Sequence, residues 1–322
     1  MKPILSICIA TYNRASYITE TLNSIIHQLV DGVEVLVVDG ASTDNTEEVI
    51  EAFTKKDSRI RYIRLPLKGG VDHDYDKSVE FAYGKYCWLF TDDDLLKPGA
   101  ISKVMKEIIT GYDLIIVNAE VRNKNLSTIL EKSRIKILSD QQFSPNEMNA
   151  LFQIAGDYLS FIGGVIIQRD VWLSRDRKKY FGTEFIHVGV IFQKMFKGSV
   201  LVIAHPYIII RLNNAQWTPR GFDIWMSQWP KLVWSLESID DATKQKIIVP
   251  EPWRNLKYLI SYRASGRFNL ALYQKYFCNE RNAILKLFAF IVSIFPKTIF
   301  DIILSSTRPV RIFIREMLHP SS

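Results

Sequence analysis

Three adjacent carboxylates are the residues of this sequence with the clearest chemical potential. Asp92, Asp93 and Asp94 follow closely on the apolar run Tyr86–Phe90. Carboxylates this close repel one another unless a cation lies among them, and Mg²⁺ or Mn²⁺ prefers oxygen ligands that it shares with phosphate groups. We therefore predict that all three bind Mg²⁺ or Mn²⁺ and that Asp92 also contacts a phosphate-bearing ligand. The alternative is a solvated acidic turn before a helix expected near Pro98.

Two further polar clusters follow apolar runs of the strand type. Thr11 and Arg14 come after the run 4–10, and Asp39 comes after the run 33–38. A hydroxyl and a guanidinium suit a nucleobase and a diphosphate, and a carboxylate can accept hydrogen bonds from a base N–H or a ribose hydroxyl. We predict that Thr11, Arg14 and Asp39 contact a nucleotide. The alternative for Asp39 is a simple turn residue.

The segment 70–77 is unusually polar, because it contains Asp72, His73, Asp74 and Asp76. These side chains fit a metal cluster, and they equally fit the cap and first turn of a helix, where acidic residues are favoured. We interpret the segment as a ligand-contacting loop with an acidic cap, in which Asp72 contacts the ligand. We do not predict a second metal there.

The elements that must position these residues alternate between strand and helix. Short β-branched runs predict strands, and apolar residues at helical spacing predict the helices between them. The expected strands are 4–10, 33–38, 59–65, 86–90 and 114–117, and the expected helices begin near Ser16, Asp44, Asp74 and Pro98. This alternation is typical of an α/β fold with a mostly parallel sheet and helices on both faces. Ligands bind such sheets at the carboxyl ends of the strands, where all three polar clusters are expected.

Composition and patterning divide the chain into two expected regions. Hydrophobic residues make up 48% of the chain and charged residues 23%, which excludes global disorder. Residues 1–215 are expected to form the α/β domain, with a nucleotide-binding half at about 1–120 and a second half at about 121–215 that binds the other substrate. Residues 216–322 are expected to form a helical, apolar and basic extension.

The extension carries the net charge of the whole chain. From Glu251 to Ser322 there are 11 Lys and Arg against 4 Asp and Glu, a difference of +7. Its apolar stretch 284–305 is interrupted by charges, and no charge-free piece approaches the ~20 residues of a spanning helix. Together with Arg308, Arg311 and Arg315, the stretch predicts an amphipathic segment in a membrane interface, with a packed helical pair as the alternative. Cations beside an apolar stretch argue against a nucleic-acid partner.

The cysteines and the N-terminus indicate a cytoplasmic protein. Cys8, Cys87 and Cys278 are an odd number without close spacing, so neither a disulfide framework nor a zinc site is expected. The N-terminal apolar run is short and is followed at once by polar residues, unlike a signal peptide. We expect a cytoplasmic location, peripheral on the inner membrane if the extension binds lipid.

Three segments in order carry a resemblance to a known family. Ser6–Arg14, Val37–Asp44 and Phe90–Asp94 resemble the opening strand and loop, the second motif and the metal-binding Asp-X-Asp motif of family-2 glycosyltransferases of the GT-A fold. The resemblance implies transfer of a sugar from a nucleotide diphosphate with Mg²⁺ or Mn²⁺. It also implies that Thr11 and Asp39 contact the nucleoside and that the three aspartates hold the ion on the diphosphate. More narrowly, Gly69–Ser78 and Thr91–Pro98 resemble abequosyltransferase-type enzymes of bacterial O-antigen assembly, which use a CDP-linked dideoxyhexose.

The sequence departs from that family at two places. Many relatives have an Arg-Asn pair where Tyr75-Asp76 stands here, so contact of that arginine with phosphate is not expected. Many also have a Glu-Asp pair that supplies the catalytic base, and the corresponding stretch 183–189 contains only Glu184 and His187 as candidates. For His187, a core position or a metal ligand is the alternative, and Asp157 is a weaker third candidate. A retaining enzyme would need no such base.

The leading hypothesis is a transferase of a hexose or deoxyhexose from a CDP-, dTDP- or UDP-linked donor. The acceptor is expected to be a polyprenyl-lipid-linked glycan or a polysaccharide at the inner membrane. A nucleotidyltransferase is the second hypothesis, but the loop 11–15 lacks the glycines of a phosphate-binding loop. A non-catalytic, membrane-recruited binding module is the third, favoured by the missing Glu-Asp pair and opposed by the intact aspartates.

Overall fold

The computed structural model describes residues 2–300 except 215 and 217. The chain forms two compact units. The first comprises the chain up to Asn214 together with Leu236–Thr243, and the second comprises Ala215–Ser235 and the chain from Lys244 onward. Arg308, Arg311 and Arg315, which the sequence analysis assigned to a membrane interface, lie outside the described residues.

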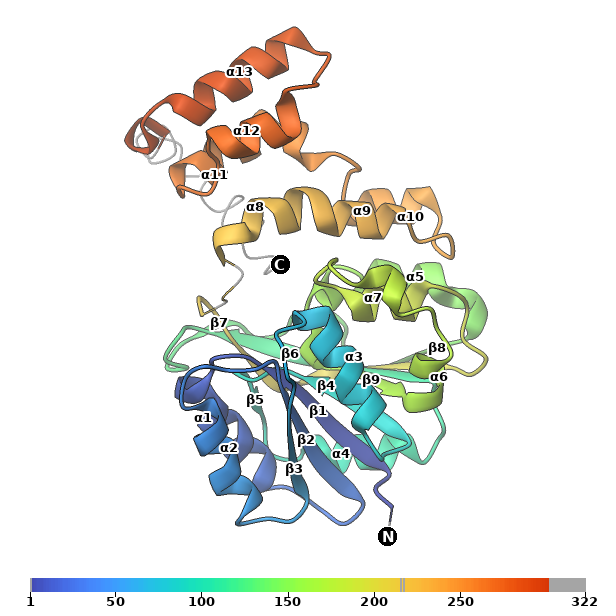
Figure 1. The fold of residues 1–322 in the computed structure, drawn as a ribbon. Coiled ribbons are helices and arrows are strands. Elements are labelled where there is room, and N and C mark those ends of the chain that lie inside the picture. The colour runs from blue at the N-terminus through green and yellow to red at the C-terminus, as the bar shows by residue number, and fades with distance from the viewer. Residues whose placement is uncertain (1, 215, 217, 301–322) are drawn as a thin grey trace. The chain divides into compact units, whose positions relative to one another are not determined.

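A mixed sheet of ten strands forms the core of the first unit (Figure 1). Its order is β3-β2-β1-β4-β9-β6-β10-β5, with β7 paired to β6 and β8 to β10. The neighbours β3, β2, β1 and β4 run parallel, whereas β9 runs antiparallel between β4 and β6. The strands are β1 (Leu5–Thr11), β2 (Val33–Asp39), β3 (Ile60–Arg64), β4 (Tyr86–Phe90), β5 (Leu95–Leu96), β6 (Leu114–Arg122), β7 (Ile129–Glu131), β8 (Gln141–Phe143), β9 (Val165–Gln168) and β10 (Val200–Arg211).

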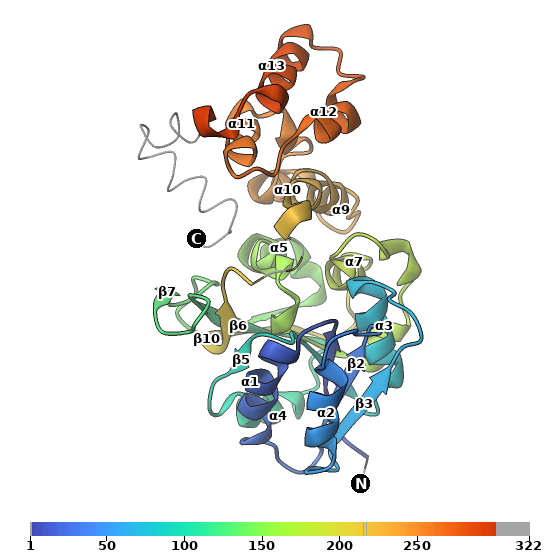
Figure 2. The ribbon, with the colours of Figure 1, turned by 60° about the vertical axis from the view of Figure 1, so that its left-hand side comes forward.

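Helices cover both faces of this sheet (Figures 1 and 2). On one face α1 and α2 contact each other, while α3 packs against β1 and β2 from the other face. The crossover from β3 back to β4 passes over β2 and β1, and this path places α3 opposite α1 and α2. The helices of this unit before β10 are α1 (Ala15–Ile26), α2 (Thr46–Thr54), α3 (Val71–Phe81), α4 (Ala100–Ile108), α5 (Met148–Ala155), α6 (Arg169–Leu173) and α7 (Ile186–Phe192).

The expected α/β fold with helices on both faces is confirmed, with shifts at several boundaries. Helix α3 begins at Val71 instead of Asp74, directly after Gly70, whose φ of +89° suits glycine. Strand β10 continues through Pro206, although proline has no N–H to donate to a neighbouring strand. Its register against β6 shifts between Ile203 and Ile208, so the proline lies in an irregular stretch where no ladder hydrogen bond is needed.

The second unit is helical around an apolar cluster that includes Phe222, Leu259, Phe268 and Phe277. The helices after β10 are α8 (Gly221–Asp223), a π-helical turn (Ile224–Gln228), α9 (Trp229–Trp234), α10 (Asp241–Ile247), α11 (Leu256–Ala264), α12 (Leu270–Phe277) and α13 (Ala283–Ile294). Among the described residues, none of the helices combines the length and the hydropathy that crossing a bilayer requires.

Candidate functional site

The parallel register brings the polar strand ends together at one edge of the sheet. Thr11 is paired with Asp39 across β1 and β2, and Ile9 is paired with Phe90 across β1 and β4. The chain therefore leaves β4 beside Thr11 and continues into the three aspartates. Three segments far apart in the sequence meet at the carboxyl ends of adjacent strands, which is the edge where open α/β sheets bind ligands.

Two of the aspartates face a single guanidinium. Arg14 Nε lies 3.4 Å from Asp92 Oδ1, and Arg14 Nη2 lies 3.2 Å from Asp93 Oδ2. Asn214 Nδ2 also donates to Asp93 Oδ2 at 2.8 Å, and Arg14 Nη1 donates to the Asn214 carbonyl at 3.0 Å. The carboxylates of Asp92 and Asp93 thus converge on one cationic position at the end of β4.

Asp94 is oriented differently, because both of its oxygens are engaged within the protein. Its Oδ1 accepts from the Arg211 backbone N–H at 2.7 Å, and its Oδ2 accepts from the Thr91 hydroxyl at 2.5 Å. The side chain is only 3% exposed. Asp94 therefore fastens the end of β4 to the end of β10, and this placement does not support the predicted metal-ligand role.

Burial gives this acidic cluster unusual proton affinities. Burial, followed by the Asp93 charge, raises the pKa of Asp92 to about 7, although Arg14 opposes the shift. Burial also raises the pKa of Asp93 and lifts that of Asp94 well above its usual value, with Arg14 and Arg211 lowering the Asp93 pKa. The Arg14 guanidinium faces two of these carboxylates, and that of Arg211 also pairs with Glu20, so additional positive charge would favour the ionised forms.

The donor set fits a divalent cation shared with a ligand. Asp92 and Asp93 supply carboxylate oxygens, which are the ligands that Mg²⁺ and Mn²⁺ prefer. In the part of the chain that the structure describes, no three Asp, Glu, His or Cys side chains are grouped as a metal site. An ion held by Asp92 and Asp93 therefore needs further oxygens from a phosphate-bearing ligand or water, as is usual for Mg²⁺ beside phosphates.

Asp39 is enclosed by its own loop and by the neighbouring strand. Its Oδ1 accepts from the backbone N–H and the hydroxyl of Ser42 at 2.8 and 2.7 Å, and its Oδ2 accepts from the Tyr62 hydroxyl at 2.7 Å. Asp39 is fully buried. Burial and the Asp39 hydrogen bond raise the pKa of Tyr62. This carboxylate shapes the loop at the end of β2, and the predicted contact of Asp39 with a nucleotide stays a prediction.

Asp72 lies in the first turn of α3 and binds the turn before α7. Its Oδ2 accepts from the Glu184 N–H at 2.8 Å, and its Oδ1 accepts from the Ile186 N–H at 2.9 Å. The side chain is buried, and burial raises the pKa of Asp72 to about 6. Both oxygens are committed inside the protein, so this geometry does not favour the predicted ligand contact for Asp72.

The two base candidates have very different surroundings. Glu184 is partly exposed and has a left-handed backbone with φ +68°, which is uncommon for a residue other than glycine. His187 is buried within α7, and its Nε2 donates to the Leu159 carbonyl at 2.6 Å. Burial lowers the pKa of His187 to about 4. The geometry thus favours the core alternative for His187 and leaves Glu184 as the accessible carboxylate.

The sequence profile of glycosyl transferase family 2 matches residues 6–175, which is more than half of the chain. The chain belongs to glycosyl transferase family 2. It is 27% identical to abequosyltransferase RfbV of Salmonella typhimurium over 232 residues, which cover 68% of this chain and 69% of the relative. It is 24% identical to a Campylobacter jejuni GalNAc(5)-diNAcBac-PP-undecaprenol beta-1,3-glucosyltransferase over 212 residues, 65% of each chain.

Solved glycosyltransferases share the fold. One is mannosyltransferase PcManGT from Pyrobaculum calidifontis in complex with GDP-Man and Mn²⁺. It superposes with a TM-score of 0.56 at 14% identity, covering 98% of this chain and 84% of the other. This likeness confirms the GT-A fold expected from the sequence resemblance, and membership of the family identifies the protein as an enzyme of glycosyl transfer.

Three residues of this glycosyltransferase site were missed by the sequence analysis. Tyr75 donates its hydroxyl to the Phe90 carbonyl at 3.0 Å, and Arg211 Nε donates to the Asp93 carbonyl at 3.0 Å. Asn214 is the third, through its bond to Asp93. For Arg211 and Asn214, the signal in the sequence was polar residues near the end of the apolar run that forms β10, and nothing in that run indicates which strand end it meets.

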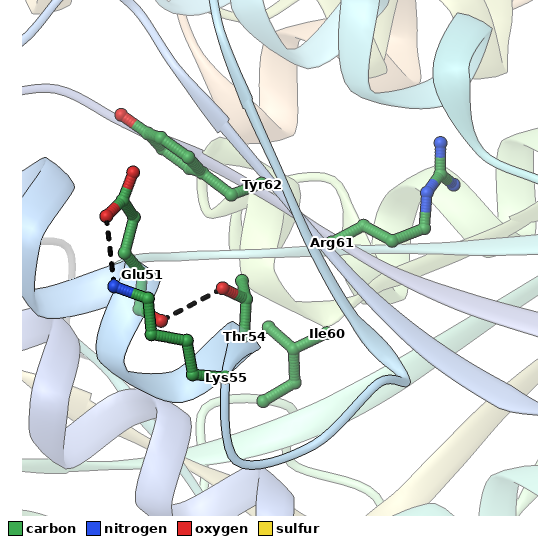
Figure 3. A pocket seen from close by; sticks show the side chains of 6 residues that line it. All are labelled: Glu51, Thr54, Lys55, Ile60, Arg61 and Tyr62. Atoms are coloured by element: carbon green, nitrogen blue, oxygen red, sulfur yellow. Dashed lines mark hydrogen bonds and ion pairs between the residues drawn. The ribbon is translucent and has the colours of Figure 1, made fainter.

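A hollow on the surface of this glycosyltransferase lies elsewhere (Figure 3). It is lined by residues from the end of α2 and from the beginning of β3, namely Glu51, Thr54, Lys55, Ile60, Arg61 and Tyr62. The candidate site lies at the carboxyl ends of the strands, whereas this hollow opens where β3 begins. We therefore do not assign substrate binding to it.

Proposed function

We propose that this enzyme transfers a hexose or deoxyhexose from a nucleoside-diphosphate sugar to a hydroxyl of a growing bacterial cell-surface glycan. The observation that carries the proposal is the convergence of Asp92 and Asp93 on Arg14 at the carboxyl ends of β1 and β4. A guanidinium beside two carboxylates can bind a diphosphate directly, and the carboxylates can hold a cation against it.

Asp92 and Asp93 are the residues that would hold Mg²⁺ or Mn²⁺. When bound, the ion neutralises charge on the diphosphate as the sugar leaves. The complex of PcManGT with GDP-Man and Mn²⁺ supports divalent metal use in this fold. Arg14 would then pair with the diphosphate, and Asn214 would keep Asp93 oriented through the hydrogen bond already present.

Glu184 is our proposed general base. In an inverting transfer the acceptor oxygen forms a bond to the anomeric carbon, while the bond from that carbon to the diphosphate oxygen breaks. The bonding electron pair leaves with the nucleoside diphosphate, and the acceptor proton passes to the Glu184 carboxylate. Its partial exposure supports this role, whereas burial and a hydrogen bond to Leu159 oppose it for His187.

The relatives narrow the substrates we propose. The likeness to abequosyltransferase RfbV supports a CDP-linked deoxyhexose as the first donor to test, followed by dTDP- and UDP-linked sugars. The likeness to an enzyme named for a PP-undecaprenol-linked acceptor supports a polyprenyl-diphosphate-linked glycan as the acceptor. Such an acceptor would be met on the cytoplasmic face of the inner membrane, where we place the protein as a peripheral enzyme.

The second unit offers a surface for that membrane. Helix α13 buries Leu285, Ala289 and Val292, while it exposes a second apolar face formed by Ile284, Leu287, Ile291 and Ile294. When a helix is apolar on two faces and the protein core covers only one, the other face needs a second apolar environment. The excess of cations from residue 251 onward suits anionic lipid headgroups, and we propose that the exposed face of α13 lies in the membrane interface.

A panel of CDP-, dTDP-, UDP- and GDP-linked sugars tests the proposed function, with lipid-linked oligosaccharide as acceptor and Mg²⁺, Mn²⁺ or EDTA. We expect one donor class to yield glycosylated acceptor and free nucleoside diphosphate, and Asp93→Asn to abolish both products. Formation of nucleoside triphosphate and sugar 1-phosphate when inorganic diphosphate is added to the donor would instead indicate a nucleotidyltransferase. Nucleotide-sugar binding without turnover by any donor would support the non-catalytic module.

A further inference from the structure

The buried carboxylate of Asp72 has no place in the chemistry proposed so far. It lies on α3, more than a hundred positions before the residues that it binds, and it holds two backbone N–H groups of one turn. Those groups belong to Glu184 and Ile186, on either side of Phe185. We infer that Asp72 is a positioning residue. It fixes the turn that carries Glu184, so that the Glu184 carboxylate meets the acceptor hydroxyl. This inference rests on the proposed role of Glu184 as the base.

The turn needs such an anchor because its backbone is strained. Gly182 and Glu184 both have left-handed backbones, with φ +84° and +68°. Glycine adopts this conformation freely, but for a residue with a Cβ it is strained and persists only where the surroundings enforce it. Two hydrogen bonds that the Asp72 carboxylate accepts from N–H groups of this one turn supply that enforcement, and hydrogen bonds to a charged group are the stronger kind.

The same helix ties this turn to the acidic cluster. Tyr75 follows Asp72 by three positions and therefore projects from the same side of α3. Its hydroxyl donates to the carbonyl of Phe90, the last residue of β4. Burial, followed by the charges of Asp92, Asp93 and Asp94, raises the pKa of Tyr75 well above its usual value. One turn of α3 thus holds the end of β4 through Tyr75 and the Glu184 turn through Asp72. The anchors of the proposed base and of the donor site therefore lie within one turn of the same helix.

A second acid on α3 offers a matched control. Asp76 is as buried as Asp72, since each is 4% exposed. It accepts from Trp172 Nε1 at 2.9 Å and pairs with Arg177 Nε at 2.6 Å, so it braces α6 and the following segment and does not touch the Glu184 turn. A general loss of packing around α3 should therefore follow from changes at either acid, whereas a loss of base positioning should follow only from changes at Asp72.

A double-mutant cycle tests the inference. The variants are Asp72→Ala, Glu184→Gln and their combination, with Asp76→Asn alone and combined with Glu184→Gln as the control. Misplacing a catalytic group by about 1 Å can cost roughly 100-fold in rate, so we expect Asp72→Ala to lower kcat about 30- to 100-fold. The Asp72→Ala/Glu184→Gln double variant should be no slower than Glu184→Gln alone, because there is no base left to position. Asp76→Asn should lower kcat by the same factor in the wild type and in Glu184→Gln.

Amide hydrogen exchange gives a readout that does not depend on activity. Asp72→Ala should speed exchange at Glu184 and Ile186, and Asp76→Asn should not. If Asp72→Ala folds poorly, Asp72→Asn, which keeps acceptor capacity on one oxygen only, serves in the same cycle. Additive losses for Asp72 and Glu184, or a wild-type kcat for Asp72→Ala, overturn the positioning role while leaving Glu184 as the base. A wild-type kcat for Glu184→Gln overturns the base assignment itself, and the positioning role with it.

Discussion

The backbone N–H of Arg211 donates to the Asp94 carboxylate at 2.7 Å, and this bond joins the last residue of β10 to the acidic cluster after β4. Arg211 adds a second link, from Nε to the Asp93 carbonyl. The cluster is therefore divided in function. Asp94 holds the two strand ends together from inside, and Asp92 with Asp93 faces the cationic position at Arg14.

This division predicts opposite phenotypes for neighbouring aspartates. Asp94→Ala removes the acceptor of a buried N–H, which costs about 1 to 3 kcal/mol for each donor left unsatisfied, so the melting temperature should fall. Asp93→Ala should change stability less. Conversely, MnCl₂ with CDP or UDP should still raise the melting temperature of Asp94→Ala but not that of Asp93→Ala. Thermal melts with and without these ligands measure both effects, and loss of the ligand response in Asp94→Ala alone would contradict the assignment.

Replacing Arg14 should weaken donor binding more than it lowers the stability of the fold. Its fork pairs with two carboxylates, and in the proposed complex it pairs with the diphosphate as well. Arg14→Ala removes charge-assisted hydrogen bonds worth about 1.5 to 3 kcal/mol, so the donor KM should rise roughly 10- to 100-fold. Arg14→Lys should recover only part of this loss, since lysine lacks the fork. Arg59→Ala, which breaks a surface pair with Asp57, is the control and should leave donor KM unchanged.

Glu184→Gln should lower kcat without weakening donor binding. Glutamine keeps the shape of the side chain but cannot accept the acceptor proton, and general-base catalysis contributes about 10²- to 10⁴-fold. Steady-state kinetics with varied donor and acceptor measure the split between kcat and KM. Glu48→Gln, at an exposed glutamate of α2, makes the same chemical change away from this turn and should leave kcat unchanged. A large kcat loss in His187→Gln with normal Glu184→Gln kinetics would reverse the base assignment.

Much of the site was predictable because it depends on parallel strands. Thr11, Asp39 and Asp92 each follow an apolar run, and parallel pairing brings such ends to one edge. The roles of Asp72 and Asp94 were not predictable. Their partners, Glu184 and Arg211, lie 112 and 117 positions further along the chain, and only the tertiary fold brings them near. A sequence shows that an acidic residue is present, but it does not show whether the carboxylate faces a ligand or a backbone N–H.

Charged substitutions on the exposed face of α13 should weaken membrane binding. Leu287 and Ile294 are 61% and 48% exposed, so Leu287→Glu and Ile294→Glu should leave the helical core intact. Both substitutions place a carboxylate where the proposed contact is with apolar lipid chains and anionic headgroups. Sedimentation of the full chain with phosphatidylglycerol vesicles should show several-fold less bound protein, while Leu138→Glu, at an exposed leucine of the first unit, should bind as wild type. Equal vesicle binding by all variants would show that the exposed face of α13 is not the membrane contact.

The buried imidazole of His187 should lower the stability of the wild type in mild acid relative to a variant that lacks it. Burial lowers its pKa in the folded chain to about 4, while the unfolded chain keeps the ordinary value near 6.5. Between these values the unfolded state binds a proton at His187 that the folded state does not, so the contribution of His187 to stability is full above pH 6.5 and is lost as the pH drops toward 4. The shift corresponds to about 3 kcal/mol across that window. The raised pKa values of Asp72 and Asp92 change stability in the opposite sense over this range, and they do so equally in the wild type and in a His187 variant. Urea unfolding at several pH values should show His187→Gln, which keeps a neutral donor for the Leu159 carbonyl, gaining stability relative to the wild type as the pH falls from 6.5 toward 4. His27→Gln, at an exposed position, should follow the wild type.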